Sequence, residues 1–572
     1  MTARTTAHYF LEGLREAGAE YLFANMGTDH ATLIEEMARQ EAEGTPLVRT
    51  LLCPHENTAV HMALGYAMVT GRGQAVLVHV DVGTANAAMG LHNALRTRLP
   101  VLLVAGRAPY TSHGELPGTR DNYVHFIQEP FDQAGLVRPY VKWEADLPSG
   151  VMVKEILHRA HSVMSSDPPG PAYLTLRRET LAEQWDESRL RANAQVGHPP
   201  HRLGGADPAS IERIADRLLA ARAPLIITSY AGRNAAVPER LARLAELIGA
   251  RVVEANPLVL NMPRTHACFA GFSANGFLPD TDVGILLDVD VPWIPSEVDI
   301  APDSHWIQVD VDPLKNASPM WPYAVHQRMM ADSGRVLEQL TEVLQRRMSA
   351  GFAAEAAQRA RRYADEAAAR REAAAAAAAS GGQPGAIAAP YLCAAIARHL
   401  PEDALLLNEA VRTAPTVCAQ IPRTRAGTYA GNGGGGLGWS AGFALGAKLA
   451  APEREVVRIV GDGAFYFGNP SSTFATARQY GLPTLTVLVD NAGWAAVKTA
   501  TARVHPDGYA RRQDQFQSRL ANGVAFTQIA EAAGAFGLAI DDPEQVDSAI
   551  ARCLQEVRAG RSALLHARIT PL

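Results

Sequence analysis

Cysteine is scarce in this chain, with five residues among 572. The five are scattered, and no two of them form a Cys-x-x-Cys pair: Cys53, Cys268, Cys393, Cys418 and Cys553. A zinc site or a disulfide framework needs paired or regularly spaced cysteines, so neither is expected here. We predict that all five are reduced, buried thiols.

Long apolar runs are missing as well, and there is no excess of positive charge. No apolar run reaches the length that crosses a bilayer, and the first residues, MTARTTAHYFLEGLREAG, have the pattern of an amphipathic helix rather than a signal peptide. The formal net charge of −6 argues against nucleic acid or an anionic membrane as the main partner. These features predict a cytoplasmic, globular protein that binds neither nucleic acid nor membrane.

The chain is too long for a single core and contains three similar blocks. Residues 1–185, 200–345 and 386–572 each alternate helical and strand patterns, which indicates a doubly wound parallel sheet in each block. Residues 350–385 contain an Ala/Arg/Glu-rich stretch that strongly favours a helix and ends at SGGQPG. The predicted fold class is therefore α/β, with three doubly wound parallel-sheet domains and a solvated linker helix.

The most informative stretch is Val456–Lys498 in the third block. Val456–Val460 and Pro483–Val489 read as strands, with a helix between them. Gly461-Asp462-Gly463 follows the first strand, and Asp490-Asn491 ends the second. The carboxyl ends of parallel strands meet at one edge of a sheet, so Asp462 and Asn491 can converge. A carboxylate and an amide oxygen suit Mg²⁺ or Ca²⁺, and Mg²⁺ commonly leaves room for phosphate oxygens. The sequence thus predicts a diphosphate-bearing ligand at this edge.

This Gly-Asp-Gly motif, followed one helix later by Asn, resembles the thiamine diphosphate motif. The segment CPHENTAVHMALGYAMVTG, together with Val76–Arg107 and its Gly-Thr-x-Asn turn, is similar to the pyrimidine-binding domain of thiamine diphosphate enzymes. GGGLGWSAGFALGAKLA precedes the diphosphate motif in the same order as in that family. The resemblance is to the acetolactate synthase and benzoylformate decarboxylase branch and covers nearly the whole chain. It implies a pyrimidine-binding, a central and a diphosphate-binding domain.

The resemblance implies roles for residues around the cofactor. Glu56 matches the glutamate that hydrogen-bonds the aminopyrimidine ring, and a carboxyl group in an apolar pocket can share a proton with that ring. The alternative for Glu56 is an acid that only stabilises the start of a helix. Leu437 matches the apolar residue that bends the cofactor, and Gly435 would offer its carbonyl oxygen to the cofactor's amine.

The same resemblance implies a metal site and a diphosphate site. Asp462, Asn491 and the main-chain oxygen of Gly493 would bind Mg²⁺, with Gly461 and Gly463 on either side of Asp462. One departure is Asp490, where the family has asparagine. Asn408–Thr416 matches the loop that contacts the diphosphate. Where benzoylformate decarboxylases have hydroxyl residues, this chain has Val411 and Arg412, then Thr413. Arg412 could pair with phosphate oxygens or face solvent.

On the substrate side, Thr28, His79 and Gln128 match residues near the substrate in this branch of the family. His79 could relay protons, although a lone histidine at the end of a strand is more often structural. Asp81 and His30 are further polar candidates at the same edge. No histidine stands in Asp288–Asp299, where the decarboxylase has its second catalytic histidine, so benzoylformate itself is in doubt as the substrate.

The central block bears on other cofactors and on partners. Asp288 and Asp290 stand where a flavin phosphate would need a cation, so FAD is not expected. Family members share each cofactor between two subunits, which implies a homodimer or homotetramer. The stretch Trp494–Phe516 is expected to form a helix and a cap over the active site.

Together these features predict an acetolactate-synthase-like enzyme that decarboxylates a 2-oxo acid and then protonates the product or ligates it to a second carbonyl. The alternatives are a benzoylformate-decarboxylase-like or C–C lyase activity, an oxidising enzyme if flavin does bind, and a non-catalytic paralogue that acts as a partner subunit. A dinucleotide site at Gly431–Gly438 is disfavoured because we expect no strand directly before it and no ribose-binding acid after it.

Overall fold

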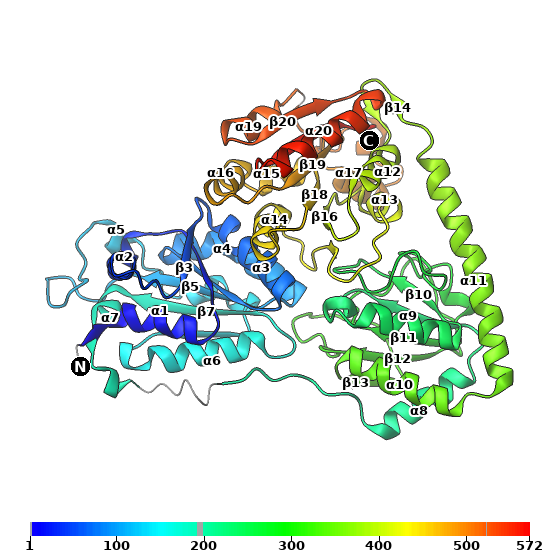
Figure 1. The fold of residues 1–572 in the computed structure, drawn as a ribbon, viewed down its shortest axis with the longest axis horizontal. Helices are drawn as coiled ribbons and strands as arrows, with labels where there is room; N and C mark the ends of the chain where they lie inside the picture. Colours follow the sequence, from blue (N-terminus) through cyan, green and yellow to red (C-terminus); the bar gives the residue numbers. More distant parts are fainter. Residues whose placement is uncertain (1–2, 191–197, 522, 572) are drawn as a thin grey trace.

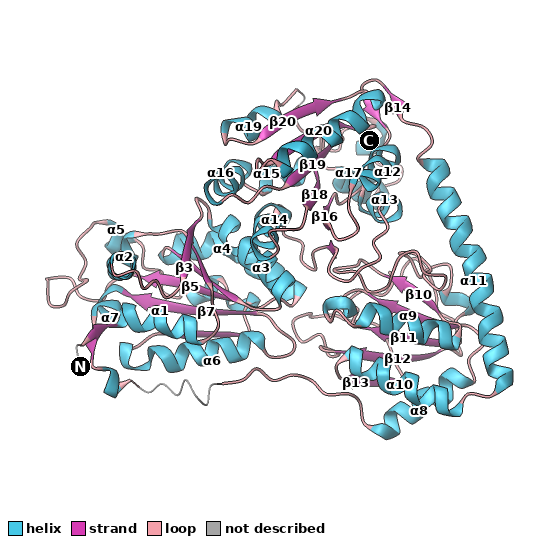
Figure 2. Ribbon diagram, in the orientation of Figure 1, coloured by secondary structure: helices cyan, strands magenta, loops and turns pink. Residues whose placement is uncertain are grey.

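Three parallel sheets form the framework of the molecule, a computed structural model that describes residues 3–190, 198–521 and 523–571 (Figure 1). Helices lie on both faces of the sheets (Figure 2), and the central strands are buried along their length. Such strands are continuously apolar instead of alternating. The α/β fold class is therefore confirmed, while the domain boundaries that we assigned stay a prediction.

The first sheet has the strand order β3-β2-β4-β5-β7-β6, and all its neighbouring strands run parallel. Its strands are β2 (Tyr21–Ala24), β3 (Arg49–Leu52), β4 (Gln74–Val78), β5 (Val101–Arg107), β6 (Trp143–Asp146) and β7 (Pro171–Arg177). Its main helices are α1 (Thr6–Glu16), α2 (Ala31–Ala42), α3 (Glu56–Thr70), α4 (Val80–Thr97) and α6 (Val153–Ser165). The chain leaves β2 in one direction and returns on its other side as β4. This reversal is the switch point at which such sheets bind ligands.

The second sheet has the order β10-β9-β11-β12-β13 and is also parallel. It consists of β9 (Pro224–Thr228), β10 (Arg251–Glu254), β11 (Val283–Leu287), β12 (His305–Asp310) and β13 (Gln327–Met330), with α8 (Pro208–Leu219), α9 (Val237–Ile248) and α10 (Ser333–Arg347). Helix α11 (Ala350–Ala377) then runs along the outside of the molecule to the third sheet (Figure 1).

The third sheet has the order β17-β16-β18-β19-β21-β20. Its strands are β16 (Leu405–Glu409), β17 (Tyr429–Ala430), β18 (Val456–Gly461), β19 (Leu485–Asp490), β20 (Phe536–Ile540) and β21 (Ala563–Arg568). Its helices are α12 (Ala389–His399), α13 (Ala414–Gln420), α14 (Trp439–Ala450), α15 (Asp462–Phe467), α16 (Pro470–Tyr480), α17 (Ala495–Val504), α18 (Tyr509–Arg512), α19 (Phe526–Ala532) and α20 (Val546–Arg558). Here the switch point lies between β16 and β18.

Helices α3 and α14 join the first and third sheets through contacts that only glycine allows. A Cβ at Gly65 would lie 2.0 Å from the Phe443 carbonyl oxygen, and one at Gly446 would lie 1.9 Å from that of Met62. Both helices are buried on nearly every side, as expected for helices without a polar face. Their close approach holds the edges of the two sheets next to each other.

Several local expectations were wrong. Gly83 to Asn86 are not a turn, because α4 begins at Val80 and contains all four residues. Asp462 follows β18 as expected and is the first residue of a short helix, α15, that was not predicted. A strand, β17, does directly precede the glycine run at Gly431, so that part of the argument against a dinucleotide site fails.

The linker helix and the cysteines can also be compared with expectation. Helix α11 is less solvated than expected: Phe352, Ala356, Tyr363 and Ala367 are buried, three of them in the core of the second block. All five cysteines are free and buried, as predicted. In the described ranges we find no helix with the length and apolarity to span a membrane.

Candidate active site

A cavity of about 440 Å³ opens at the switch point of the third sheet. Its lining includes every residue assigned above to cofactor or metal in the third block: Arg412, Thr413, Gly435, Leu437, Gly461, Asp462, Gly463, Asn491 and Gly493. These residues come from the ends of β18 and β19, from the loops after β16 and before α14, and from the segment before α17. The parallel register of the sheet thus brings together segments far apart in the sequence.

Two of the residues that line this cavity carry a carboxylate, Asp462 and Glu409. Burial, and then the nearby Asp490 carboxylate, raise the pKa of Asp462 to about 7, while backbone N–H groups of Gly463 and Gly493 donate to it. A buried carboxylate with a second acid nearby is stabilised by a cation. Together with the Asn491 amide it forms the hard-oxygen set that suits Mg²⁺.

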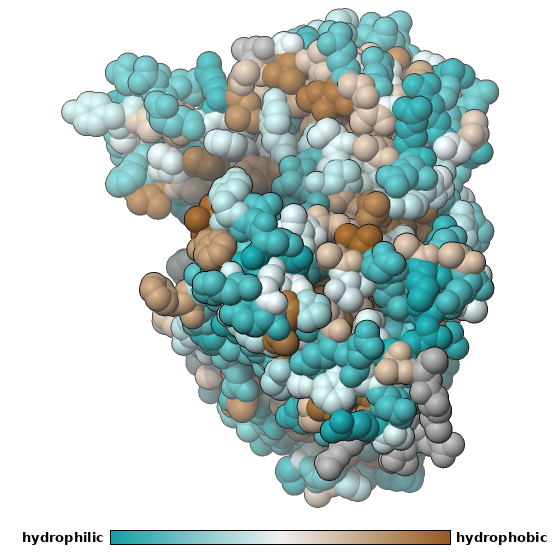
Figure 3. All heavy atoms as spheres, turned by 90° about the vertical axis from the view of Figure 1, so that its left-hand side faces the viewer, coloured by the Kyte–Doolittle hydropathy of each residue, from teal (hydrophilic) through white to brown (hydrophobic). Residues whose placement is uncertain are grey.

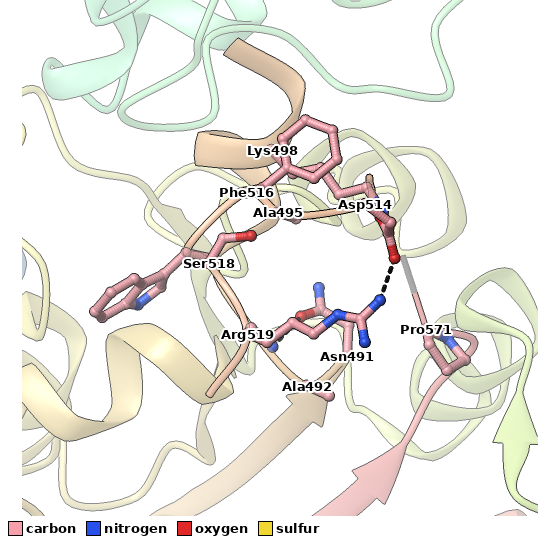
Figure 4. Close-up of a pocket in the computed structure, with 11 residues that line it drawn as sticks. Asn491, Ala492, Ala495, Lys498, Asp514, Phe516, Ser518, Arg519 and Pro571 are labelled. Atoms are coloured by element: carbon pink, nitrogen blue, oxygen red, sulfur yellow. Dashed lines mark hydrogen bonds and ion pairs between the residues drawn. The ribbon is translucent and has the colours of Figure 1, made fainter. Parts of the chain in front are cut away.

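The loop after β19 is held in an unusual conformation. Ala492 has φ 64° and Gly493 has φ 157°, and a Cβ at Gly493 would lie 2.3 Å from the Ser518 carbonyl oxygen. The Trp494 N–H donates to that oxygen at 2.8 Å. Figure 4 shows residues of this loop beside Ser518 and Arg519, where the two segments line a second cavity of about 310 Å³. The requirement for glycine at 493 follows from this close backbone approach.

Asp490, which departs from the family pattern, turns into this loop. One of its oxygens accepts from the Ala492 N–H at 2.9 Å, and the other lies 2.8 Å from His566 Nε2. The departure therefore stabilises the loop that carries Asn491 and Gly493.

Glu409, which we did not assign from the sequence, organises the other wall of the cavity. Its carboxylate accepts from the N–H groups of Gly438, Trp439 and Ser440 at 2.5, 3.2 and 3.0 Å. An acid at a helix N-terminus satisfies free N–H groups and complements the helix dipole. Glu409 thereby fixes the start of α14 and the loop that holds Gly435 and Leu437. Its position at the end of strand β16 was the available signal.

Helix α4 of the first sheet holds the same glycine loop from outside. The Gly435 N–H donates to His92 Nε2 at 3.1 Å, and the Gly436 N–H and carbonyl each bond the Asn93 side chain at 3.1 Å. His92 thus links helix α4 of the first block to the glycine loop of the third block. Asn93 was not predicted from the sequence.

The expected cap is a helix, α17, and its first turn borders the cavity. Trp494, Ala495, Ala496 and Val497 line this side, and none of them carries a charge. This part of the cavity therefore presents apolar groups beside the polar cluster of Asp462 and Asn491.

Glu56 lies elsewhere in the same chain and is not among the residues that line the 440 Å³ cavity. It is the first residue of α3 and is 7% exposed. Its Oε2 accepts from Asn86 Nδ2 at 3.1 Å. Asn86 is the last residue of the Gly-Thr-x-Asn motif, so the motif serves to hold Glu56 rather than to form a turn.

Thr28, His79 and Gln128 form a second cluster, at the switch point of the first sheet. His79 follows β4, and its Nε2 lies 3.0 Å from Gln128 Oε1. Thr28 is exposed, and its hydroxyl lies 3.2 Å from His125 Nε2. His125 had not been singled out from the sequence. Among the described residues, this cluster is also separate from the lining of the 440 Å³ cavity.

We call the group around Glu56 and Thr28 and the group around Asp462 the two half-sites of the chain. They share no residue of the 440 Å³ cavity lining, although Asn57, next to Glu56, donates to the carbonyl oxygen of Phe467 in that lining at 3.0 Å. Large apolar side chains are exposed near both: Leu52, Val82, Phe126 and Ile127 on the first block, and Val411, Phe467, Val497 and Tyr509 on the third. Figure 3 shows apolar residues gathered around a hollow on one face of the molecule. Where exposed apolar groups are contiguous, they mark contact surfaces.

In the central block the acids that follow β11 are already paired. Asp288 is 3.1 Å from Arg233, and Asp290 is 2.7 Å from Arg98 of the first block. Arg98 is buried and also lies over the Tyr230 ring. Both arginines are therefore engaged in ion pairs with these acids instead of being available to a flavin phosphate. The expectation of no FAD stays a prediction.

Comparison with known proteins places two segments of the chain in one family. Residues 4–136 match the thiamine pyrophosphate enzyme, N-terminal TPP binding domain, and residues 414–567 match the corresponding C-terminal TPP binding domain. Thiamine pyrophosphate is the same compound as thiamine diphosphate. The first segment contains Glu56 and the Thr28 cluster, and the second contains Asp462 and Asn491.

Relatives along the full chain are of the same kind. Benzoylformate decarboxylase of Pseudomonas aeruginosa is 26% identical over 508 residues, covering 85% of this chain and 86% of the relative. Acetolactate synthase isozyme 3 large subunit of Escherichia coli is 24% identical over 527 residues, covering 89% of this chain and 86% of the relative. A probable 2-ketoarginine decarboxylase of Pseudomonas aeruginosa is 27% identical over 491 residues, covering 80% of this chain and 78% of the relative.

Among solved structures, the thiamine diphosphate-dependent 4-hydroxybenzoylformate decarboxylase of Rhodococcus jostii RHA1 has the same fold. It superposes over 100% of both chains with a TM-score of 0.80 at 20% identity. From the two matched domains, this chain belongs to the family of thiamine pyrophosphate enzymes.

Proposed function

We propose that this protein decarboxylates a small 2-oxo acid with the help of thiamine diphosphate and Mg²⁺, and that it releases the product or joins it to a second carbonyl. The observation that carries the proposal is the arrangement of Asp462, Asn491, Gly435 and Leu437 around one cavity, with Glu56 held by Asn86 in the first block. Relatives named as decarboxylases and acetolactate synthases support it. When bound, thiamine diphosphate supplies a nucleophilic carbon and an electron sink for loss of CO₂.

The chain's own residues would hold and orient that cofactor. Asp462, the Asn491 amide and the Gly493 carbonyl would bind Mg²⁺, and Thr413 and Arg412 would contact the diphosphate. Glu56 would accept or donate a proton at the pyrimidine ring. The apolar first turn of α17 would exclude water from the reacting end.

Because Glu56 and Asp462 belong to different half-sites, we propose that two chains complete each active site. The smallest active unit is then a homodimer, and a tetramer would contain two such pairs. Burial of the exposed apolar groups near both half-sites would favour this association.

The substrate is tested with a panel of 2-oxo acids that differ in size and charge, with CO₂ release as the readout. We expect release from acids with an apolar side chain, because α17 borders the cavity with Trp494, Ala496 and Val497. Parallel reactions with an added acceptor aldehyde would show whether the product is ligated or released. If no 2-oxo acid of the panel releases CO₂ in the presence of cofactor and Mg²⁺, the proposal is wrong.

Shared active sites are tested by mixing two inactive variants. Glu56→Gln and Asp462→Ala chains produced together in equal amounts should recover about one quarter of the parental activity. Random pairing makes about half of the dimers mixed, and each mixed dimer has one intact site out of two. Each variant alone should stay inactive. Absence of any recovery in verified mixed dimers would place the whole site within one chain.

A further inference from the structure

Asp29 is a buried acid next to His79, and neither its position nor its role was anticipated from the sequence. It follows β2 at the switch point of the first sheet and is 1% exposed. Its Oδ1 lies 2.5 Å from His79 Nδ1, and its Oδ2 accepts from the Val80 N–H at 3.2 Å. The acid is thus bonded both to the histidine and to the first residue of helix α4.

Each ring nitrogen of His79 faces an oxygen atom. Its Nδ1 lies beside Asp29 Oδ1, and its Nε2 lies beside Gln128 Oε1. An imidazole that donates to both oxygens is the protonated imidazolium, so this environment suits the charged ring. His79 is 18% exposed at its side chain, so a substrate can reach it in place of Gln128.

Two glycines leave the space that this pair occupies. A Cβ at Gly27 would lie 2.1 Å from His79 Nδ1, and a Cβ at Gly106 would lie 1.4 Å from Asp29 Oδ2. No flexible side-chain end could relieve both contacts, since the Asp29 carboxylate is enclosed. Glycine at 27 and 106 is therefore required by the Asp29–His79 pair, not by backbone conformation.

We propose that Asp29 is a positioning residue that orients His79 and keeps it protonated as the proton donor to the substrate side of the active site. The proposal rests on the proposed function and adds a residue to it. An acid that bonds one nitrogen of an imidazole fixes the ring and leaves the other nitrogen to exchange a proton. Here Nε2 is that nitrogen.

The surroundings of the pair support this assignment. The hydrogen bond to Asp29 raises the pKa of His79 above its ordinary value, against the opposing effect of burial. His30, on the other side of Asp29, has its pKa lowered, first by burial, and its Nδ1 accepts from the Gly27 N–H. The other charged or titratable groups near the pair are Asp81, His125, Arg178 and Asp121. Burial and then Arg178 lower the pKa of His125, so the pKa values of the neighbouring histidines shift in the opposite direction to that of His79.

The first experiment measures the His79 pKa by NMR in the cofactor-free protein labelled with ¹⁵N-histidine, with the signals identified from their loss in His79→Gln. In the parent protein we expect a pKa above 6.5, the usual histidine value. In Asp29→Asn the acceptor charge is gone and burial remains, so the pKa should fall by at least about one unit, to below 6.5. Asp81→Asn removes the same charge two residues from His79 without touching the ring, and it should shift the pKa by much less.

The second experiment uses the turnover of a substrate found in the 2-oxo acid panel. A donor with a raised pKa is active at low pH and loses its proton as the pH rises through that pKa. Asp29→Asn should move the alkaline limb of kcat to lower pH and reduce kcat by about 10²-fold. The KM should change little, because a positioning residue does not itself hold the substrate.

The outcomes separate this inference from the proposed function. A parental His79 pKa at or below 6.5 overturns the inference, and so does an Asp29→Asn variant whose pKa and pH profile match the parent. The parental titration needs no variant, so the test survives if Asp29→Asn fails to fold. A shifted His79 in a protein that decarboxylates no 2-oxo acid would refute the proposed function and keep the Asp29–His79 pair.

Discussion

Replacing Glu56 by Gln is expected to reduce kcat by about 10²–10⁴-fold, the contribution of a positioned acid–base group. Gln keeps the size and the hydrogen bond with Asn86, but it cannot take or give the proton that the pyrimidine ring exchanges. Cofactor and Mg²⁺ affinities should change far less, because the diphosphate end is held by another half-site. Steady-state kinetics at saturating cofactor and calorimetric binding of thiamine diphosphate measure the two effects separately.

The matched control is Glu155→Gln. Glu155 also lies in the first turn of a helix of the first block, α6, and is exposed. Loss of an acid from a helix start costs only about 0.3–1 kcal/mol of stability, so its activity should equal that of the parent. If Glu56→Gln behaves like Glu155→Gln, then Glu56 only stabilises its helix.

Replacing Asp462 by Ala should weaken Mg²⁺-dependent cofactor binding by at least about 100-fold. Loss of a residue that only hydrogen-bonds a metal ligand already costs up to about 100-fold in metal affinity, and Asp462 is proposed as a ligand itself. The carboxylate is the single anionic side chain in the proposed ligand set, and Ala leaves only neutral oxygens at the metal. Calorimetric titration of thiamine diphosphate at fixed Mg²⁺ concentrations measures the effect. CD and thermal unfolding verify that the variant is folded.

Asp507→Ala provides the comparison, because Asp507 is an exposed acid of the same block that does not line the cavity. Its Mg²⁺ dependence should match the parent. Cofactor binding by Asp462→Ala that is as tight and as Mg²⁺-dependent as in the parent would show that the metal is held elsewhere.

The sequence alone was sufficient for features that repeat locally. The strand and helix patterns predicted the α/β class, because a buried parallel strand is recognisable from its own apolar residues. Asp462 and Asn491 were found because each ends a strand, and parallel strands place such ends at one edge. The family resemblance then supplied a role for Glu56, and these three residues carry the proposed function.

The sequence could not predict contacts between distant segments. Glu409 is one residue after Asn408, yet only the start of α14, folded back onto it, reveals a capping acid. Gly83 to Asn86 looked like a turn because of glycine and threonine, but these residues belong to helix α4, which packs on the first sheet. The strand β17 has two residues, too few for any pattern.

What the sequence by itself determined is the set of groups that could serve thiamine diphosphate, since their chemistry belongs to each residue. The tertiary structure decided which groups meet. It gathered Asp462 and Asn491 at one cavity whose lining does not include Glu56, and it brought Asp29 to His79 through the space left by Gly27 and Gly106. Those outcomes depend on how close two backbones approach, a quantity set by the packing of whole sheets and helices and not by any stretch of neighbouring residues.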